Sequence, residues 1–503
     1  MNTPAHSRLR VVRAGLDTYQ TPVVYMHRDC DVCRAEGFAA LTRVEMEVEG
    51  RSLIATLNVV VGDMLPPDEV ALSEAAWNAL RPRPGALATF RHPEPAASAG
   101  ALRAKVFGQR LAGTDFDALM RDTVDNRLSD LELAAFVTAC AGERLDMEET
   151  TALTRAMIAV GQRLDWGEGL VLDKHSVGGL PGNRTTPIVV AIVAALGHRI
   201  PKTSSRAITS PAGTADTMEV LAPVALDLPA MRRVVEREGG CIVWGGNVRL
   251  SPADDILIRV ERPLDFDSDG QLVASVLSKK AAAGATHVLI DMPVGPTAKV
   301  RDADAAASLA GRLRATGEAI GLALAVRPSD GRQPVGIGIG PALEARDVLK
   351  VLRGEPDAPA DLRQRAIEVA GALLDLVPGA AGDGASRAEA TLASGAAWAK
   401  FLAICEAQGG FREPQTAGFR VALEAAAGGR VRSVDNRRLA RIAKLAGAPA
   451  AAMAGVECGT RIGDRVQPGQ PLMTVHAQSR GELDYALEYA RTHDVFTIDP
   501  EAA

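Results

Sequence analysis

A glycine-rich loop carries the side chains with the clearest chemical potential. The segment from Asp173 to Thr186 reads DKHSVGGLPGNRTT and leads into an apolar helical pattern from Ile188 to Leu196. The first turn of a helix presents unpaired backbone N–H groups and attracts an anion by about 0.3 to 1 kcal/mol. Glycine lets the backbone approach the anion closely, and Lys174 adds a full charge. The loop therefore predicts a phosphate site, although a plain glycine turn is the commoner origin of any single loop of this kind.

A second loop is rich in hydroxyl groups. It runs from Lys202 to Asp216 (KTSSRAITSPAGTAD), and nine of its fifteen side chains can bond to an anion or a sugar. Hydroxyls at this density would be costly to bury without partners, so they either cap neighbouring helices or face a polar ligand. Taken alone, this loop favours capping.

Two other patterns are weaker. His27, Cys30 and Cys33 supply three potential zinc ligands without an evident fourth, which favours a structural role or free thiols over a metal. The glycines at 336, 338 and 340 have the wrong spacing for a dinucleotide loop. No Ser-His-Asp ordering or HExxH pattern occurs. We therefore expect neither a metal nor an organic cofactor.

The two loops lie in a region with the pattern of an α/β domain. From about residue 170, short apolar runs such as 241–244 and 287–290 alternate with helical patterns, which predicts a parallel sheet with crossover helices. A helical piece interrupts this region, with Ser251 as its cap and Pro252 in its first turn. A further helix is expected from 271 to 284.

The regions on either side have different patterns. Alternating apolar residues between 44 and 57 predict a β-hairpin, and four prolines between 81 and 97 predict a linker with a boundary near 95. Capping-box spacings at Ser129/Glu132 and Asp146/Glu149 then predict helices up to about 165. The last hundred residues are β-rich again.

Composition sets further limits on function. The chain has 503 residues, 47% of them hydrophobic, which requires several packed units. Its net charge of −6 gives no electrostatic reason to bind nucleic acid or an anionic membrane surface. There is no long uninterrupted apolar stretch and no hydrophobic signal core at the start, so we expect a cytoplasmic protein. Four of the six cysteines lie among apolar neighbours and are expected to be reduced core thiols.

Several motifs together resemble the thymidine phosphorylase/AMP phosphorylase family. Residues 174–179 match the KHSxGG signature of thymidine and pyrimidine-nucleoside phosphorylases, and 204–221 resemble the AMP phosphorylase branch. The segments WGG at 244–246, SPADD at 251–255 and ASVLSKK at 274–280 follow in the family's order. The resemblance extends from about residue 100 to the end of the chain.

The resemblance implies an α/β fold of the nucleoside phosphorylase type II architecture. This architecture has a small helical domain, a large mixed α/β domain, a β-rich N-terminal domain and a β-rich C-terminal subdomain. On this chain we expect a β-rich domain at 1–95, a helical domain at 100–168 with 252–284 returning to it, an α/β phosphate- and substrate-binding domain at 169–250 and 285–415, and a β-rich subdomain at 416–503. The turn-rich segment 463–472 is similar to a lipoyl-type hairpin without the carrier lysine.

The resemblance also implies a role for individual residues. Phosphate contacts are implied for Lys174, Ser176, Gly178, Gly179, Thr186, Ser204 and Thr214. Catalytic roles are implied for His175, Lys279 and Asp267, of which Asp267 matches a proton donor of the nucleotide-cleaving branch. Further substrate contacts are implied for Ser205, Arg206, Ala207, Ile208, Thr209, Ser210, Arg259, Ser275 and Lys299. Ser275 and Lys279 are four residues apart, so they share one face of a helix.

The implied reaction is cleavage of an N-glycosidic bond by inorganic phosphate, converting thymidine to thymine and 2-deoxyribose 1-phosphate. Pro181 and the loop at 205–210 fit the nucleotide-cleaving branch better, so an AMP phosphorylase producing ribose 1,5-bisphosphate is an alternative. A phosphoribosyltransferase of the anthranilate type, which needs magnesium, and a catalytically silent nucleotide-binding regulator are others. The expected partners are small molecules only, with phosphate as co-substrate, and the expected assembly is a homodimer or larger.

Overall fold

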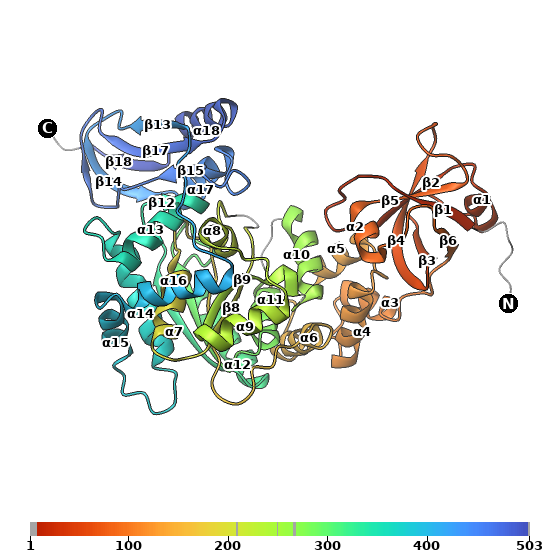
Figure 1. Cartoon of the computed structure of the whole chain (residues 1–503), viewed down its shortest axis with the longest axis horizontal. Helices are drawn as coiled ribbons and strands as arrows, with labels where there is room; N and C mark the ends of the chain where they lie inside the picture. The colour runs from red at the N-terminus through yellow and green to blue at the C-terminus, as the bar shows by residue number, and fades with distance from the viewer. Residues whose placement is uncertain (1–7, 208–209, 249, 265–267, 501–503) are drawn as a thin grey trace. The chain divides into compact units, whose positions relative to one another are not determined.

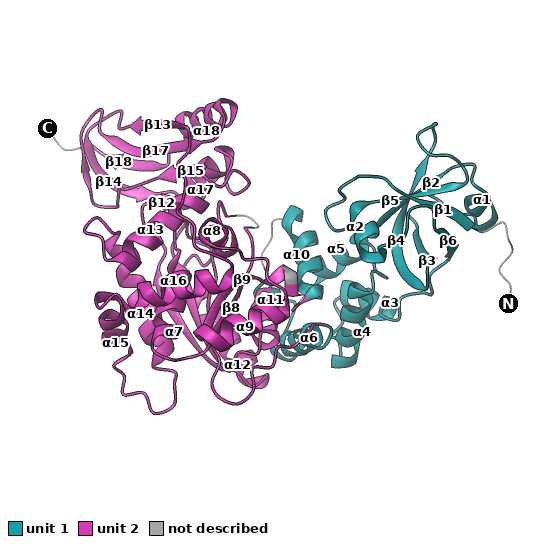
Figure 2. Cartoon of the chain, in the orientation of Figure 1, with its two compact units in different colours: residues 1–160, 252–271 teal, residues 161–251, 272–503 magenta. Residues whose placement is uncertain are grey.

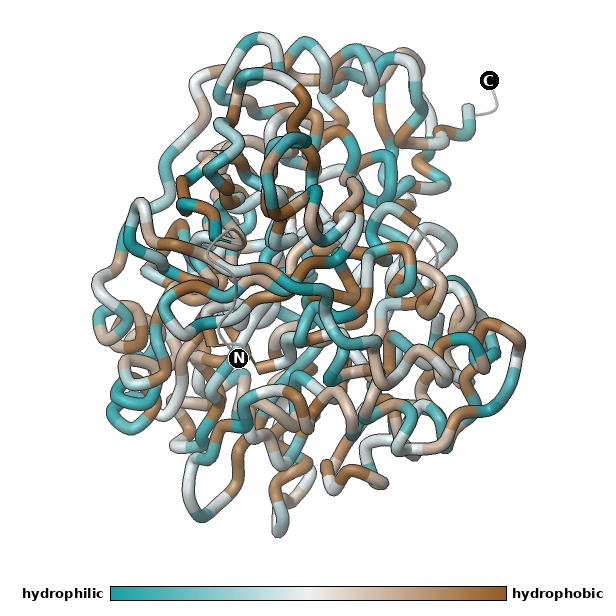
Figure 3. The backbone as a smooth tube through the Cα atoms, turned by 90° about the vertical axis from the view of Figure 1, so that its right-hand side faces the viewer, coloured by the Kyte–Doolittle hydropathy of each residue, from teal (hydrophilic) through white to brown (hydrophobic). Residues whose placement is uncertain are grey.

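The structure is a computed structural model, and it describes residues 8–207, 210–248, 250–264 and 268–500 (Figure 1). The chain divides into two compact units, coloured separately in Figure 2: residues 1–160 with 252–271, and residues 161–251 with 272–503. Apolar and polar residues are interspersed along the backbone (Figure 3). Within the described residues, no helix has both the length and the apolar character needed to cross a membrane.

The first unit begins with a closed barrel whose strands follow the order β1-β5-β2-β4-β3-β6. The elements of this region are β1 (Arg8–Arg13), β2 (Val23–His27), α1 (Asp31–Glu36), β3 (Arg43–Val48), β4 (Arg51–Val60), β5 (Glu69–Leu72), α2 (Glu74–Leu80) and β6 (Leu87–Arg91). The predicted hairpin is confirmed, because β3 and β4 pair antiparallel around a turn at Glu49 and Gly50. The alternating side chains Val44, Met46 and Val48 fill the barrel core.

The predicted linker at 81–97 is wrong in its central part, because it contains strand β6. This strand pairs with both β1 and β3 and so closes the barrel. Pro84 and Pro93 lie on either side of β6, so the prolines bound the strand without removing a hydrogen bond from its interior. Within it, Ala88 and Phe90 alternate inward, a short pattern that the flanking prolines obscured.

The remainder of the first unit is helical, as predicted. It comprises α3 (Ala99–Val106), α4 (Gly113–Val124), α5 (Asp130–Ala139), α6 (Met147–Ala159) and α10 (Pro252–Leu264). Both predicted capping boxes are confirmed: Ser129 and Glu132 start α5, and Asp146 and Glu149 start α6. The interrupting piece α10 packs against α4 and α5 of the same unit.

Helix α1 gives the cysteine motif near the start of the chain a structural role. Cys30 is the N-cap of this helix, and its Sγ accepts a hydrogen bond from the backbone N–H of Cys33 at 3.2 Å. Both thiols are buried in the barrel core, and the other four cysteines are also free and buried, as predicted. Across the described residues, no group of three or more His, Cys, Asp or Glu side chains could hold a metal ion.

The second unit contains the predicted parallel strands. They are β7 (Leu172–Ser176), β8 (Ile200–Ser204), β9 (Gly240–Trp244), β10 (His287–Val294) and β11 (Ala323–Asp330). β7, β10 and β11 pair in parallel, as do β8 and β9, and a parallel bridge between Val171 and Arg199 connects the two groups. The prediction of a parallel sheet is therefore confirmed.

Helices cover these strands. They are α7 (Thr185–Ala195), α8 (Thr214–Leu221), α9 (Leu228–Glu238), α11 (Asp269–Ala282), α12 (Ala303–Ala319), α13 (Pro341–Arg353), α14 (Ala360–Leu374), α15 (Gly384–Ala393) and α16 (Ala396–Gln408). Every residue of α7 from Thr185 to Ala194 is buried, because α14 and α16 pack around it. The apolar run that follows the glycine loop is thus the central helix of the largest core.

The C-terminal subdomain is β-rich, as predicted. Its elements are β12 (Gly338–Ile339), β13 (Phe419–Glu424), β14 (Gly429–Val434), α17 (Asn436–Leu445), β15 (Gly455–Glu457), β16 (Arg465–Val466), β17 (Pro471–Ala477), α18 (Arg480–Thr492) and β18 (Phe496–Asp499). The lipoyl-type hairpin expected at 463–472 is wrong, because β16 pairs with β14 whereas β17 pairs with β13 and β15. The turn at 467–470 therefore connects two different sheets.

A buried ion pair joins two helices of the first unit and leads to a prediction. Lys105 Nζ of α3 lies 2.7 Å from Glu149 Oε1 of α6, and both side chains are only 4% exposed. Replacing Lys105 with Ala would leave the Glu149 carboxylate uncompensated in the interior, which is expected to cost about 3 to 5 kcal/mol of the free energy of unfolding. Urea unfolding followed by circular dichroism measures this loss.

The matched control is Arg110→Ala. Arg110 bonds to Asp146 and Glu148 at the solvent-exposed start of α6, so its removal should leave the unfolding midpoint unchanged. An equal effect of both substitutions would contradict the special contribution of the buried pair.

Candidate active site

The two chemically rich loops both follow the carboxyl ends of parallel strands. The glycine loop follows β7, and the hydroxyl-rich loop follows β8. Ligands of open parallel sheets bind at this edge, because neighbouring strands deliver their loops to the same place. The structure thus gives the two sequence motifs a common location.

Lys174 is the central cation of this edge. It is only 1% exposed, and its Nζ donates to Thr185 Oγ1 at 2.8 Å and to Thr186 Oγ1 at 3.1 Å. These threonines form the first turn of α7, so the ammonium lies beside the positive end of the helix. Burial lowers the pKa of Lys174 to about 8, although the nearby carboxylate of Asp291 opposes this shift. The arrangement is a donor-rich site suited to an anion.

Asp291, in the buried middle of β10, holds the glycine loop in place. Its carboxylate accepts from Ser176 Oγ at 3.3 Å, from Asn183 Nδ2 at 3.1 Å and from Ser329 Oγ at 2.7 Å. Burial alone would raise the pKa of Asp291, but the charges of Lys174 and Arg365 outweigh it and lower the pKa. Asp291 is therefore an ionised anchor, and sequence reasoning missed it because its partners are distant in the chain.

The glycines of the first loop are required by close backbone contacts. Gly179 has a φ of +78°, and a Cβ there would lie 2.4 Å from the backbone nitrogen of Lys299. Gly182 has a φ of +71°, and a Cβ there would lie 2.2 Å from the carbonyl oxygen of Val335. The contact at Gly179 brings Lys299, a predicted substrate residue, beside the glycine loop.

The second loop holds two hydroxyls that the resemblance assigns to phosphate. Ser204 is 8% exposed, and among the described residues its Oγ has no hydrogen-bond partner. Thr214 begins α8, and its Oγ1 accepts from Arg184 at 2.7 Å. Ser205 is exposed, and Ser210 Oγ donates to the carbonyl of Ala212 at 3.0 Å.

Arg206 is paired with two carboxylates of α8. Its guanidinium bonds to Glu219 at 2.5 Å and to Asp216 at 3.2 Å, and it lies 5.0 Å from the centre of the Trp244 ring. Asp216 also accepts from the backbone N–H groups of Ala207 and Gly213, so capping organises this part of the loop. The predicted contacts at Ile208 and Thr209 lie outside the described residues.

Three further predicted residues lie on α10 and α11. Ser275 and Lys279 share the half-buried face of α11, as their spacing indicated. Arg259 lies on α10 of the first unit and pairs with Asp130 at 2.9 Å. Asp267 lies outside the described residues.

A buried charge cluster lies behind His175. Asp173 is bonded to Lys202 at 3.1 Å and to Lys280 at 2.7 Å, so two cations share one carboxylate. Burial lowers the pKa of His175 well below its ordinary value, and the charges of Lys280 and Lys202 lower it further. His175 is therefore neutral at pH 7, mainly because of burial, and sequence reasoning did not identify the charge cluster that adds to this effect.

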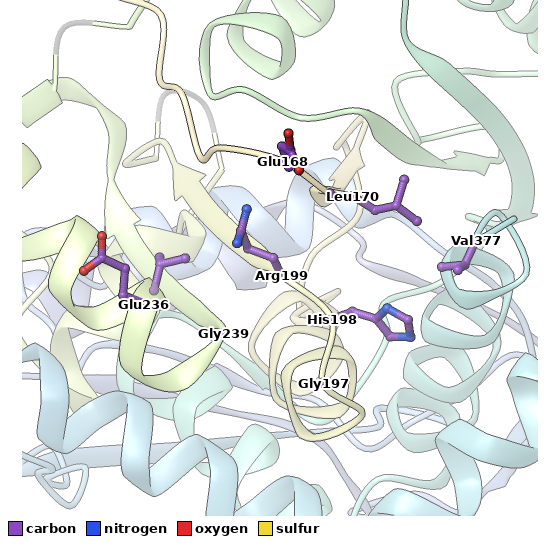
Figure 4. A pocket seen from close by; sticks show the side chains of 10 residues that line it. Glu168, Leu170, Gly197, His198, Arg199, Glu236, Gly239 and Val377 are labelled. Carbon is purple, nitrogen blue, oxygen red and sulfur yellow. The ribbon is translucent and has the colours of Figure 1, made fainter.

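A cavity of about 410 Å³ lies at the opposite edge of the strands (Figure 4). It is lined by segments that precede strands, namely 168–170 before β7, 197–199 before β8 and Gly239 before β9. None of the predicted site residues lines it, so this cavity is separate from the candidate site.

Comparison with protein families covers most of the chain. The helical bundle domain of a glycosyl transferase family matches residues 99–161, and the a/b domain of that family matches 168–398. The pyrimidine nucleoside phosphorylase C-terminal domain matches 430–495. These matches agree with the observed order of helical, α/β and C-terminal regions.

Close relatives match nearly the whole chain. A protein of Acidovorax sp. (strain JS42) is 64% identical over 99% of this chain and 98% of its own. Proteins of Polaromonas sp. (strain JS666 / ATCC BAA-500) and Sphingopyxis alaskensis are 63% and 59% identical, over 96% and 97% of this chain and 95% of each relative. All three bear the name "putative thymidine phosphorylase".

A solved structure shares the fold at low sequence identity. The anthranilate phosphoribosyltransferase of Thermus thermophilus matches with a TM-score of 0.52 and 19% identity, over 61% of this chain and 99% of that one. The full-length relatives identify the family more narrowly than this likeness of fold does. With loops, domain order and relatives in agreement, the chain belongs to the thymidine phosphorylase family.

Proposed function

We propose that this chain cleaves the N-glycosidic bond of thymidine with inorganic phosphate and releases thymine and 2-deoxyribose 1-phosphate. The observation that carries the proposal is the buried ammonium of Lys174, which meets two hydroxyls at the first turn of α7. The names of the full-length relatives support thymidine as the substrate.

The proposed reaction requires that phosphate be held against the sugar. An oxygen of phosphate forms a bond to C1′, the bond between C1′ and the base nitrogen breaks, and its electron pair leaves with the base. Phosphate is a weak nucleophile, so its fixation in line with the departing base lowers the barrier. The proposed donors that hold phosphate are Lys174, Ser204, Thr186, Thr214 and the amides at 178–179.

The departing base gains negative charge, which a cation or an acid must stabilise. Lys279 is the proposed cation, with Ser275 as its neighbour on the same face of α11. Neutral His175 would contribute a hydrogen bond, because burial and the adjacent lysines disfavour its charged form. Asp267 and Arg259 remain proposed contacts at the base.

The pairing of Arg206 favours a nucleoside over a nucleotide. A nucleotide substrate needs a second binding place for its 5′-phosphate dianion. The loop at 205–210 could provide this place, with Arg206 as its cation. In the structure its charge is already matched by Glu219 and Asp216. This observation supports thymidine over AMP.

The cellular location, partners and assembly of the enzyme are part of the same proposal. The enzyme would act in the cytoplasm on small molecules, as a homodimer or larger assembly, with phosphate as co-substrate and without a metal or an organic cofactor. The net charge of −6 supports the expectation that nucleic acid and anionic membranes are not partners.

Removal of the Lys174 charge tests the proposed phosphate site. Lys174→Met keeps an apolar chain of similar length but removes the ammonium, so release of thymine should fall by about 10²-fold to 10³-fold. Thermal unfolding verifies that the variant is folded. The control is Lys400→Met. Lys400 lies on α16 and pairs with Glu238 of α9, so this variant should keep full activity. Undiminished thymine release by folded Lys174→Met protein would refute the phosphate site.

Parallel assays of several substrates test the base and sugar preference. With thymidine, uridine, cytidine monophosphate and AMP, phosphate-dependent release of base should be fastest for thymidine. A chelator should not change the rate, which separates the reaction from a magnesium-dependent phosphoribosyl transfer. Preferential cleavage of AMP would assign the chain to the nucleotide branch, and binding without turnover of any substrate would favour a regulator.

The pH dependence of phosphate use tests the protonation of Lys174. Since its pKa is lowered to about 8, the free enzyme loses this positive charge as the pH rises through that value. The kcat/KM for phosphate should therefore fall above that pH by about tenfold per pH unit. Lys174→Arg, whose guanidinium stays protonated, should lose this fall. A wild-type profile that stays flat in the same alkaline range would contradict the expectation.

A further inference from the structure

Arg184 joins the two loops of the proposed phosphate site. It is the N-cap residue of α7, and only 12% of its side chain is exposed. Its guanidinium donates to Thr214 Oγ1 at 2.7 Å and to the carbonyl oxygen of Ala212 at 2.9 Å, both in the second loop. One side chain of the glycine loop is thereby bonded to the start of α8.

Glu344 of α13 binds the guanidinium of Arg184 and restrains it. The carboxylate lies in the first turn of α13, is 1% exposed and accepts from Arg184 Nε at 2.6 Å. It also accepts from Thr217 Oγ1 at 3.1 Å and from the backbone N–H of Gly340 at 3.4 Å. A buried carboxylate with three donors fixes the orientation of the arginine fork.

The bond from Arg184 has a consequence for the direction of the Thr214 hydroxyl. A hydroxyl has one proton to donate, and the bond from Arg184 occupies an acceptor position of Thr214 Oγ1. Its proton is then directed toward another acceptor. Lys174 imposes the same condition on Thr185 and Thr186, which also accept from a cation. The hydroxyls around the site are therefore oriented as donors, which suits a ligand that offers only acceptor oxygens.

We propose that Arg184, held by Glu344, is a positioning residue for inorganic phosphate: its bond to Thr214 Oγ1 orients this hydroxyl, at the start of α8, as a donor. This inference rests on the proposed phosphorolysis. Arg184 acts through Thr214 and not through its own charge, because Glu344 balances that charge. Lysine cannot replace it, because an ammonium lacks the planar fork that reaches Glu344, Ala212 and Thr214 together.

The test is a steady-state comparison of the wild-type protein with Arg184→Lys, Thr214→Val and the double variant. Arg184→Lys should raise the KM for phosphate by about 10-fold to 100-fold, with the KM for thymidine within about twofold of the wild-type value. If Arg184 acts through Thr214, the double variant should be no worse than Thr214→Val alone. Glu344→Gln should show the same selective rise in the KM for phosphate.

The matched control is Arg353→Lys on the same helix as Glu344. Arg353 pairs with Glu413 and lies 4.8 Å from the centre of the Trp398 ring, remote from the residues of the site. This variant should keep both KM values. Thermal unfolding with and without inorganic phosphate provides a second readout, in which Arg184→Lys should lose the rise in Tm that phosphate gives the wild-type protein.

The outcomes distinguish this inference from the proposed function. Additive effects in the double variant, or an equal rise in both KM values for Arg184→Lys, would overturn the positioning role. If Thr214→Val and Lys174→Met also left the KM for phosphate unchanged, the phosphate site would itself be wrong, and both proposals would fail. A selective rise for Thr214→Val without one for Arg184→Lys would overturn the inference alone.

Discussion

A lysine ammonium placed in the protein interior is the constraint on which the site depends. Lys174 is 1% exposed, and an isolated charge in such surroundings is strongly disfavoured. Two threonine hydroxyls, the nearby carboxylate of Asp291 and the strand that carries the lysine all contribute to its position. Burial nevertheless lowers the pKa of Lys174 to about 8, so these partners offset the cost of burying the charge only in part. The low exposure of Lys174 also means that water screens its charge only weakly, which is the property the proposed phosphate site requires.

The surrounding architecture keeps that charge at a fixed place. β7 delivers Lys174 to the edge of the sheet, and the same strand pairs with β10, whose Asp291 restrains the glycine loop. The helix that follows is buried over almost its whole length, so its first turn cannot shift without disturbing the largest core. The stretch from β7 through α7 thus provides both a rigidly packed helix and the polar edge of the sheet.

Sequence reasoning recovered the parts of this arrangement that are local in the chain. The glycine loop, the buried helix after it, both capping boxes and the parallel strands each have a pattern within about twenty residues. It missed Asp291 and Glu344, since their importance comes from partners 108 and 160 residues away. It also missed β6, because prolines on either side concealed five residues of strand. The roles of Arg259, Ser275, Lys279 and Lys299 toward the substrate stay predictions.

The closure of the N-terminal barrel by β6 limits how this region can meet other molecules. In the part of the chain that the structure describes, each strand of the barrel is hydrogen-bonded to two neighbours, so the ring has no edge strand. A neighbouring chain cannot extend it by adding a strand, and recognition at this region must use side chains and loops.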